Sequence, residues 1–466
     1  MSQDTRHLVR DQINLLRDSE QLPFCDLLDE GTIQKVLDQE GVSFRETVFT
    51  PIVTLWTFLA QVISADRCCR KAIDQLLAYL VARGKEPCRP ETDTYCKARQ
   101  RLPVGVMQSL ARETAEDLEE KAPEEWLWKG RHVNVVDGTT VSMPDTESNQ
   151  RAFPQPRTQA RGVGFPLARL VAVISLAIGA VRDLAIGPYK GKETGETALF
   201  RTLMDRLQRG DVVLGDRYFA SYFGIAMLVQ RGVDGLFRLH QKRKVDFRRG
   251  RRLGVEDHVV EWTRPARPDW MDEELYALIP ETMLVRELRV RVEEKGFRVN
   301  ELVLATTMVD GQVYSKEELV DLFMERWNIE LDLRSIKIAM EMDVLRCKTA
   351  QMVVKEIWTH LLAYNLIRGL IAAAAEAHGK EPRRLSFKGA LQALQAFRDS
   401  MGLTSRERRR ALVEHMLLAI SAYEVGNRPG RVEPRAIKRR PKPHDLLCEP
   451  REQARERLLG NRVKAR

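Results

Sequence analysis

Residues 321–337 read DLFMERWNIELDLRSIK, and this stretch decides which fold the rest of the sequence fits. An α-helix turns by 100° per residue, so Arg326, Glu330 and Lys337 fall on one narrow stripe of such a helix. Apolar residues flank the stripe on both sides, whereas an ordinary surface helix has a single apolar face. The pattern predicts a mostly buried helix that presents a carboxylate between basic groups to an enclosed site. A separate polar face lies opposite and consists of Asp321, Glu325, Asn328 and Asp332.

A simpler alternative fits the same residues. Arg326 and Glu330 at i,i+4 on a solvated face would stabilise a helix by about 0.2–0.5 kcal/mol and do nothing else. Two carboxylates upstream favour the functional interpretation: HVNVV at 132–136 ends in Asp137 of DGTT, and DVVL at 211–214 runs into Asp216 of GDRYF. An aspartate that closes a strand is more often a turn or helix cap. Two of them in one sheet, followed by an embedded glutamate, are harder to explain in that way.

The order of the predicted elements indicates the fold class. Strands are expected at 132–136, 165–178, 180–186 and 211–214, with a turn at Gly179 and a helix at 194–207 before the last strand. This order predicts an α/β, ribonuclease H-like (retroviral-integrase-like) catalytic core. Adjacent parallel strands of such a core bring Asp137 and Asp216 together at their carboxyl ends. Carboxylates there could hold a pair of metal ions for phosphoryl transfer, and hard oxygen ligands suit Mg²⁺ or Mn²⁺.

A mainly β insertion interrupts the predicted core. Asp216 and Glu330 are much farther apart in the sequence than the roughly 30–40 residues that a helix and a strand need. The intervening chain alternates in β fashion, most clearly at 284–292 and 301–306, and its front at 242–252 is intensely basic. A basic run is often a solvated loop, but beside a phosphoryl-transfer site we expect it to contact the DNA backbone. The expected contacts are Arg248, Arg249 and Arg251.

Helical regions are expected at both ends of the chain. In the N-terminal region the predicted helices are 51–65, 69–82 and 92–102. The last carries Lys97, Arg99 and Arg101, which could hold phosphates as in a helix-turn-helix, although solvated basic residues on a packing helix are equally common. The predicted organisation is a helical DNA-binding region at 1–125, the first part of the core at 126–240, the β-rich insertion at 241–312, the second part of the core at 313–378, and a helical C-terminal region with a basic tail at 379–466.

Composition narrows the function classes. The chain has 466 residues, 44% hydrophobic and 30% charged, as in globular proteins of several domains. A net charge of +9 favours a polyanionic partner. Seven cysteines without a CxxC pair predict reduced thiols in a cytoplasmic, nucleoid-associated protein, and argue against a disulfide framework or a cysteine zinc site. No signal peptide, membrane span, P-loop or GxGxxG fingerprint is found, so we expect neither a membrane nor a nucleotide cofactor.

The three motifs together resemble those of the DDE transposases of bacterial insertion sequences, in the branch with a Y-x2-R-x3-E-x6-K signature. Phe323, Arg326, Glu330 and Lys337 match that spacing without a gap, DGTT and GDRYF match the first and second acidic motifs, and the resemblance covers roughly residues 45–375. The tyrosine of the signature is phenylalanine here. Its hydroxyl is therefore absent, although the Phe323 ring could still stack or pack against DNA.

The resemblance implies a catalytic triad of Asp137, Asp216 and Glu330 that holds two Mg²⁺ or Mn²⁺ ions, with Arg326 and Lys337 on the DNA end. It also implies cut-and-paste movement, in which a 3′-hydroxyl attacks the opposite strand to form a hairpin, water reopens the hairpin, and the end joins target DNA. The implied partners are double-stranded DNA, as element ends and as target, and a second copy of the chain in the DNA complex.

A tight hairpin forces a base out of the helix, and an indole ring can hold it by stacking. The resemblance implies that a tryptophan of the insertion does so. Trp262 is favoured because it closes a strand near Arg264 and Arg267, whereas Trp270 lies among acidic residues. A packing role for both rings is an equal alternative.

Three other functions compete. A structure-selective ribonuclease H-like nuclease would share the carboxylates, but it would not need two DNA ends held together. A catalytically retired DNA-binding relative would be expected to lack a carboxylate, and all three are present. Glycoside hydrolases also use paired carboxylates, but the basic charge and the lack of aromatic-rich loops argue against that class.

Overall fold

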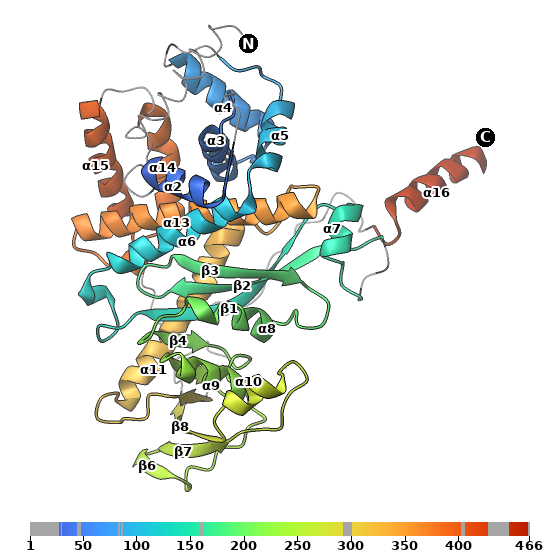
Figure 1. The fold of residues 1–466 in the computed structure, drawn as a ribbon. Coiled ribbons are helices and arrows are strands. Elements are labelled where there is room, and N and C mark those ends of the chain that lie inside the picture. The colour runs from blue at the N-terminus through green and yellow to red at the C-terminus, as the bar shows by residue number, and fades with distance from the viewer. Residues whose placement is uncertain are drawn as a thin grey trace.

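The structure is a computed structural model, and it describes residues 28, 30–43, 48–82, 84, 87–158, 160, 162–291, 301–401, 406–426 and 447–464. Within these residues one nine-stranded sheet runs through the molecule in the order β3-β2-β1-β4-β5-β9-β8-β7-β6 (Figure 1). The strands are β1 (Val133–Ser142), β2 (Leu167–Ser175), β3 (Val181–Pro188), β4 (Val212–Gly215), β5 (Asp234–Arg238), β6 (Arg251–Gly254), β7 (Asp257–Thr263), β8 (Thr282–Arg291) and β9 (Glu301–Thr306). The prediction of a mixed α/β protein built on a large sheet is confirmed.

The first five strands carry the predicted acidic motifs. β1 pairs with β2, and β2 with β3, in antiparallel register, whereas β1 with β4 and β4 with β5 are parallel. The turn from β2 to β3 passes through Gly179, whose φ of +84° is a conformation that side chains with a Cβ rarely adopt. A Cβ there would also lie 2.7 Å from the guanidinium of Arg383. Both the backbone conformation and the close contact therefore favour glycine at this position.

The strands between residues 251 and 306 extend this same sheet. β9 pairs with β5 in antiparallel register, and β8, β7 and β6 follow outward, each antiparallel to its neighbour. The helix α10 (Glu273–Leu278) connects β7 to β8. The basic run at 242–252 therefore lies just after β5, at the point where the chain leaves the parallel strands.

The two faces of the sheet pack against different helices, because side chains alternate along each strand. Val133, Val135 and Val141 of β1 join the larger core. This core also contains α6 (Val104–Glu120), α13 (Ala350–Ala377) and the helical segment at 316–339 that carries the transposase signature, called the signature helix below. Val136 points the other way into a core with α9 and α10. Asp137 and Thr139 have the parity of Val135 and Val141, so β1 presents them on the face of the signature helix. The helices of the second face are α8 (Glu196–Arg201), α9 (Tyr222–Gln230) and α10.

The remaining helices gather at one end of the molecule, above α6 and α13 in Figure 1, and α16 projects away from it. Thr50 caps the first of the long helices by accepting from the Val53 amide, and Pro51 occupies its first turn, where no backbone donor is needed. The gathered helices are α2 (Glu30–Gln39), α3 (Pro51–Ile63), α4 (Cys69–Ala82), α5 (Asp93–Arg101), α14 (Phe387–Met401) and α15 (Arg406–Ala422). The projecting helix is α16 (Arg451–Lys464), and the short α7 (Glu147–Ala152) lies between β1 and β2 in the sequence. The basic tail at 428–444 lies outside the described residues.

Candidate active site at the ends of the parallel strands

Asp137 and Asp216 occupy equivalent places on two neighbouring parallel strands. The pairing of β1 with β4 ends at Val136 and Gly215, so the two aspartates are the next residues along each chain. Asp216 directly follows β4, as expected from the sequence. Asp137 does not end its strand, contrary to the expectation, because β1 continues to Ser142 in a hairpin with β2.

Asp137 lies in a buried position close to two other carboxylates. Its pKa is raised to about 6, mainly by burial and further by the carboxylates of Asp216 and Glu196. The Gly138 amide, which donates to Asp137 Oδ1 at 2.7 Å, and the charge of Arg326 oppose this shift. A carboxyl group that resists ionisation beside two other carboxylates is characteristic of a site that awaits a cation or a proton.

Glu196 is a carboxylate that the sequence analysis missed. It begins α8 and lies against the backbone of β1, where a Cβ on Gly138 would be only 2.5 Å from its Cδ. Burial raises the pKa of Glu196, Arg169 lowers it, and Asp216 adds to the increase. The one sequence signal for this neighbour is the glycine after Asp137, which leaves room for a side chain on the opposite face of the strand.

The signature helix is not mostly buried, and that prediction is wrong. α11 (Lys316–Met324), a 3₁₀ turn (Glu325–Trp327), α12 (Asn328–Arg334) and a π-helical turn (Ser335–Ala339) follow one another without a break. One stripe is buried, whereas the side chains of Leu331 and Ile338 are 52% and 58% exposed. The prediction fails because only one of the two apolar flanks faces the core: Ile329, Asp332 and Ile336, at i, i+3 and i+7, form the buried stripe.

Asp332 shows most clearly that the buried side of the helix is predicted wrongly. The sequence analysis placed it on the separate polar face, but the structure buries it completely. Arg383 Nη1 lies 2.7 Å from Asp332 Oδ2, Arg368 forms a second ion pair with the same carboxylate, and the Tyr364 hydroxyl donates to it at 3.2 Å. This buried pair joins the signature helix to α13 and to the segment before α14.

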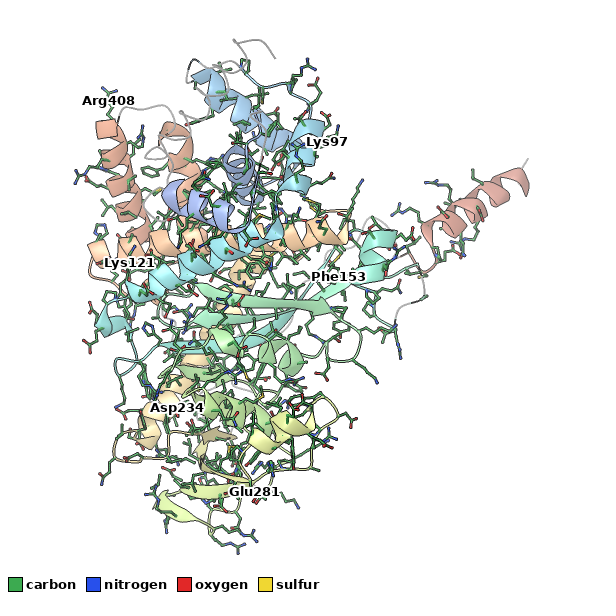
Figure 2. All side chains as sticks on the ribbon, viewed as in Figure 1. Lys97, Lys121, Phe153, Asp234, Glu281 and Arg408 are labelled. Carbon is green, nitrogen blue, oxygen red and sulfur yellow. The ribbon has the colours of Figure 1, made fainter. Side chains whose placement is uncertain are left out.

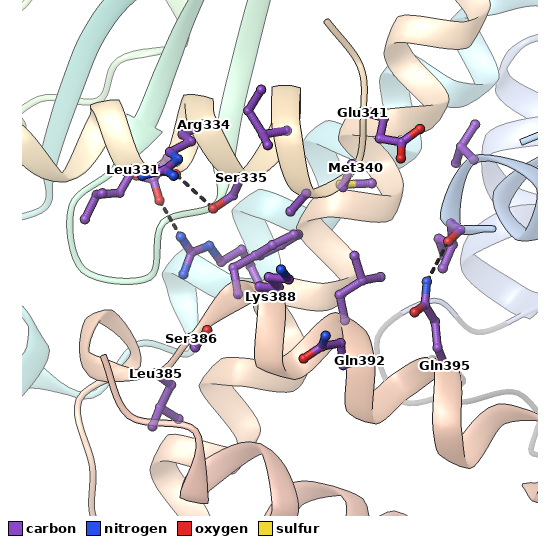
Figure 3. A pocket seen from close by; sticks show the side chains of 18 of the residues that line it. Leu331, Arg334, Ser335, Met340, Glu341, Leu385, Ser386, Lys388, Gln392 and Gln395 are labelled. Carbon is purple, nitrogen blue, oxygen red and sulfur yellow. Dashed lines mark hydrogen bonds and ion pairs between the residues drawn. The ribbon is translucent and has the colours of Figure 1, made fainter. Parts of the chain in front are cut away.

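A cleft of about 560 Å³ lies beside the exposed side of the signature helix (Figure 3). Leu331, Arg334 and Ile338 line one wall, and Lys388 and Gln392 of α14 line the other. The cleft does not include Glu330, Asp137 or Asp216. It is therefore separate from the three predicted catalytic carboxylates, although Asp332 and Glu341 line it.

Arg326 and Lys337 approach the acidic site from the signature helix. Lys337 Nζ donates to Thr139 Oγ1 at 3.2 Å, which fixes the helix against β1 two residues beyond Asp137. Arg326 forms no ion pair with any carboxylate of the described chain, and its buried Nε has no hydrogen-bond partner. The Arg326–Glu330 ion pair of the simpler alternative is therefore not formed. Arg326 instead lies over the Phe323 and Trp327 rings, 5.7 and 5.3 Å from their centroids.

Two further arginines, also missed by the sequence analysis, lie near Asp216. The pKa of Arg238, at the end of β5, is lowered by burial and by the charges of Arg217 and Arg326, and raised by Asp216. Three guanidinium groups near one carboxylate repel one another, and an anionic ligand would relieve that repulsion. The signal that could have found them is position, because Arg217 follows Asp216 and Arg238 ends the next strand.

Glu330 does not join the other acidic residues in this structure. Its residue is exposed on α12, which packs against β1. Across the described ranges, no group of three or more His, Cys, Asp or Glu side chains is arranged to hold a metal ion. The structure thus places Asp216 and Glu196 close enough to Asp137 to raise its pKa, and it carries Glu330 on the helix that packs against β1.

The predicted DNA contacts of the N-terminal region divide into two groups. Lys97 and Arg101 are exposed on α5, and Figure 2 shows Lys97 at the edge of the helical region. Arg99 requires a correction: it is only 7% exposed, and its Nη1 donates to Gln61 Oε1 at 3.1 Å. Its guanidinium packs between α3 and α5 and does not face a DNA backbone. Phe323 requires the same correction, since it is 3% exposed in the core below the signature helix.

The predicted DNA contacts between residues 241 and 312 also divide into exposed and buried residues. Arg248, Arg249 and Arg251 are exposed, with Arg248 Nε 2.8 Å from Asp246 Oδ1. Trp262 is 3% exposed and donates from Nε1 to Glu287 Oε1 at 2.8 Å. The Arg243 guanidinium lies 3.4 Å from the centroid of its ring. A base cannot stack on Trp262 in this arrangement, which is the packing role that the sequence left open.

Trp270 is only partly buried. Its ring packs edge to face with Phe223 at 6.1 Å, and Arg201 lies 3.7 Å from its centroid. No helix of the described chain has the length and apolar character needed to cross a membrane.

Comparison with known proteins gives a consistent result. A family model described as a transposase DDE domain matches residues 128–366. The transposase InsG for insertion sequence element IS4 of Escherichia coli (strain K12) is 26% identical over 427 residues, which cover 89% of this chain and 91% of that protein. The transposase for insertion sequence element IS421 of Escherichia coli is 33% identical over 98 residues, 20% of this chain and 26% of that protein.

A solved structure of the piggyBac transposase synaptic complex with hairpin DNA aligns with 85% of this chain and 84% of its own, at 9% identity. The TM-score of 0.44 is too low for this likeness to carry an argument.

Proposed function

Because this chain belongs to the DDE transposases of bacterial insertion sequences, we propose that it cleaves the ends of its element and joins them to target DNA by metal-dependent phosphoryl transfer. The observation that carries the proposal is the register of β1 and β4, which makes Asp137 and Asp216 neighbours at the ends of paired parallel strands. The raised pKa of Asp137 supports it, since a divalent cation would restore the ionised carboxylate.

The donor set fits Mg²⁺ or Mn²⁺. Mg²⁺ is usually held by one or two carboxylates together with waters and substrate phosphates, so a pair of aspartates suffices before DNA binds. Two such ions would activate the attacking oxygen and stabilise the leaving oxygen of each transfer. We assign Asp137 and Asp216, with Glu330 as the third carboxylate once DNA occupies the site, as the residues that would hold these ions.

The chain's own basic groups have a separate task. Arg326, Lys337 and Arg238 surround the acidic residues, and Arg326 has no carboxylate partner among the described residues. We assign these basic residues to the phosphates of the DNA end. The negative charge of the phosphates would supply the counter-ion that Arg326 lacks within the described chain. Glu196 contributes negative charge on the other side of β1 and helps to confine the cations to this edge of the sheet.

We further propose a ribonuclease H-like core formed by residues 126–240 and 313–378. The order β3-β2-β1-β4-β5, with two antiparallel and two parallel pairings, supports it. Residues 241–312 are the proposed insertion, and the helical regions at 1–125 and 379–466 flank the core. Exposed Lys97, Arg101, Arg248, Arg249 and Arg251 are the proposed contacts to flanking DNA.

The proposed reaction passes through a hairpin and is carried out by a homodimer on two DNA ends. The experiment that tests the function uses the purified chain and a linear DNA that carries both ends of its element. With Mg²⁺ we expect first-strand nicks, then hairpin ends, and then joining to a plasmid target. EDTA should abolish all three. Cleavage without any joining would favour a structure-selective nuclease instead.

A further inference from the structure

Three distant segments bring cysteines together beside a buried arginine. Cys69 begins α4, Cys96 lies in α5, and Cys347 precedes α13. The sulfur atoms of Cys69 and Cys96 are 3.9 Å apart, close to van der Waals contact. Cys347 is near enough to raise the pKa of Cys69. This thiol cluster lies in the N-terminal helical region and contains none of the proposed catalytic residues.

Arg99 is the counter-ion of this cluster. Its Nη2 lies 3.2 Å from Cys69 Sγ and 3.6 Å from Cys96 Sγ. Throughout the described part of the chain, no carboxylate forms an ion pair with Arg99, and its other close contacts are Gln61 and the faces of Phe58 and Tyr95. A buried guanidinium is costly without an anion, and a thiolate is the anion that these neighbours can supply.

We propose that Cys69 and Cys96 are a redox-active dithiol that hydrogen peroxide converts into a reversible intramolecular disulfide. This inference does not depend on the transposase reaction, because it rests on residues outside that site. A disulfide needs sulfur atoms about 2.05 Å apart, so the two sulfurs must approach by roughly 2 Å. The two cysteines are partly buried, Cys69 at the first position of α4 and Cys96 in the first half of α5, and the proposed change is a rotation of their side chains.

The reaction proceeds in two balanced steps. The Cys96 thiolate attacks one oxygen of hydrogen peroxide; an S–O bond forms, the O–O bond breaks, and hydroxide leaves and takes up the proton released by the thiol. The Cys69 sulfur then attacks the Cys96 sulfenic acid; the S–S bond forms, the S–O bond breaks, and the leaving hydroxide takes the Cys69 proton. Two thiols lose two electrons, and one peroxide becomes two waters.

The order of attack follows from the environment of each thiol. The hydrogen bond that it shares with Cys69 lowers the pKa of Cys96, burial opposes the shift, and the charge of Arg99 adds to the lowering. The same hydrogen bond and burial raise the pKa of Cys69, which therefore remains the protonated resolving thiol. Thiolates are the reactive form, so Cys96 reacts first.

The chain supplies matched controls. Cys68 is adjacent to Cys69, but its sulfur accepts from the Lys71 amide at 3.3 Å and belongs to a different contact. Cys88 is buried elsewhere in the same region, and Cys448 is exposed near the C-terminal helix. Serine at position 68 or 88 should leave the proposed bond intact, whereas serine at 69 or 96 should prevent it.

The test starts from the fully reduced, full-length protein. After hydrogen peroxide, alkylation of the remaining thiols with iodoacetamide and digestion with trypsin, mass spectrometry should find residues 68–70 joined to residues 86–97. The linked peptide should persist in Cys68→Ser and Cys88→Ser, disappear in Cys69→Ser, and be lost on treatment with dithiothreitol. Cys69→Ser should instead accumulate a Cys96 sulfenic acid that dimedone traps.

A second measurement tests the role of Arg99 as a positioning residue. In wild type, Cys96 should react with iodoacetamide several-fold faster than Cys448 at pH 7, and Arg99→Gln should move that pH profile upward while Arg99→Lys largely restores it. Circular dichroism establishes that each variant is folded. Linkage through Cys68, Cys88 or Cys347, or a Cys96 no faster than Cys448, would overturn the proposal whatever the outcome of the DNA cleavage assays.

Discussion

The ammonium group of Lys337 lies 3.2 Å from the hydroxyl of Thr139, two positions beyond Asp137 on the same face of β1. This hydrogen bond joins the signature helix to the strand that carries the first aspartate. Arg326, three turns earlier on the same helix, is close enough to Asp137 for its charge to lower the pKa of that carboxyl group. The basic residues of the signature are thus placed by the strand that carries the first aspartate.

Lys337→Met and Arg326→Met should weaken binding to DNA of any sequence. Each removes one phosphate contact, so the slope of log Kd against log salt should fall by about one unit in each variant. Fluorescence anisotropy between low and moderate salt measures that slope. Thr139→Val is the matched control, since it removes the hydrogen bond but no charge. If the slope is unchanged in both cationic variants, these residues pack the helix and do not bind phosphate.

Asp137→Asn should stabilise the protein above pH 6 in the absence of divalent metal. The pKa of Asp137 is raised in the folded state to about 6, so the stability linked to its protonation is fully present below its unfolded pKa, near 4, and is lost as the pH rises through 6. The amide variant should therefore gain roughly 1–3 kcal/mol over wild type at pH 7.5 and nothing at pH 4.

Urea denaturation in EDTA at several pH values measures this difference. Asp205→Asn, a change at an exposed carboxylate beside Arg231, is the control and should show no such dependence. A variant that is less stable than wild type at pH 7.5 would show that the ionised Asp137 carboxylate does not destabilise the folded protein, and would contradict this account.

Asp332→Ala should lower the free energy of unfolding by about 3–5 kcal/mol, because it leaves Arg368 and Arg383 buried without their carboxylate. Asn328→Ala, one turn earlier on the same helix, is a suitable comparison and should cost much less. The measurement is chemical denaturation. A loss below about 1 kcal/mol would mean that the two arginines find another partner or water.

Trp262→Ala should destabilise the insertion and slow nicking and hairpin formation to the same extent. The ring is buried, hydrogen-bonded to Glu287 and covered by Arg243, and loss of a buried tryptophan costs about 3–5 kcal/mol. Single-turnover assays on pre-nicked and intact ends separate the two steps. Selective slowing of hairpin formation, relieved by an abasic site opposite the ring, would show that Trp262 moves out to hold a base. Trp270→Ala is the comparison variant, measured in the same two assays, because its ring is only partly buried.

Much of the architecture could be predicted because it depends on local patterns. The start of β1, predicted at 132–136, and the strand before Asp216 follow from β-rich runs, and the turn at Gly179 follows from a glycine between two such runs. Partners across the fold could not be predicted. Glu196 contacts Gly138, Arg383 contacts Asp332 and Arg99 contacts two cysteines only through tertiary packing. Such contacts produce no regular spacing of residues that a sequence pattern could reveal.

The buried side of the signature helix is predicted wrongly for a different reason. The sequence pattern has two apolar flanks and does not show which of them faces the core. Ile329, Asp332 and Ile336, at i, i+3 and i+7, form the buried stripe, whereas Leu331 and Ile338, seven residues apart on another side, are exposed.

The central claim is that Asp137, Asp216 and Glu330 act together on DNA through divalent metal. The most direct measurement is Mg²⁺-dependent nicking of an element end by Asp137→Asn, Asp216→Asn and Glu330→Gln, with Glu325→Gln on the same helix as the control and binding to the same DNA measured in parallel. Each of the three should lose nicking by several orders of magnitude and keep end binding, because an amide is nearly isosteric but carries no charge for the metal, while the control stays active. Near-normal nicking by any one of the three would remove that residue from the site and contradict the account.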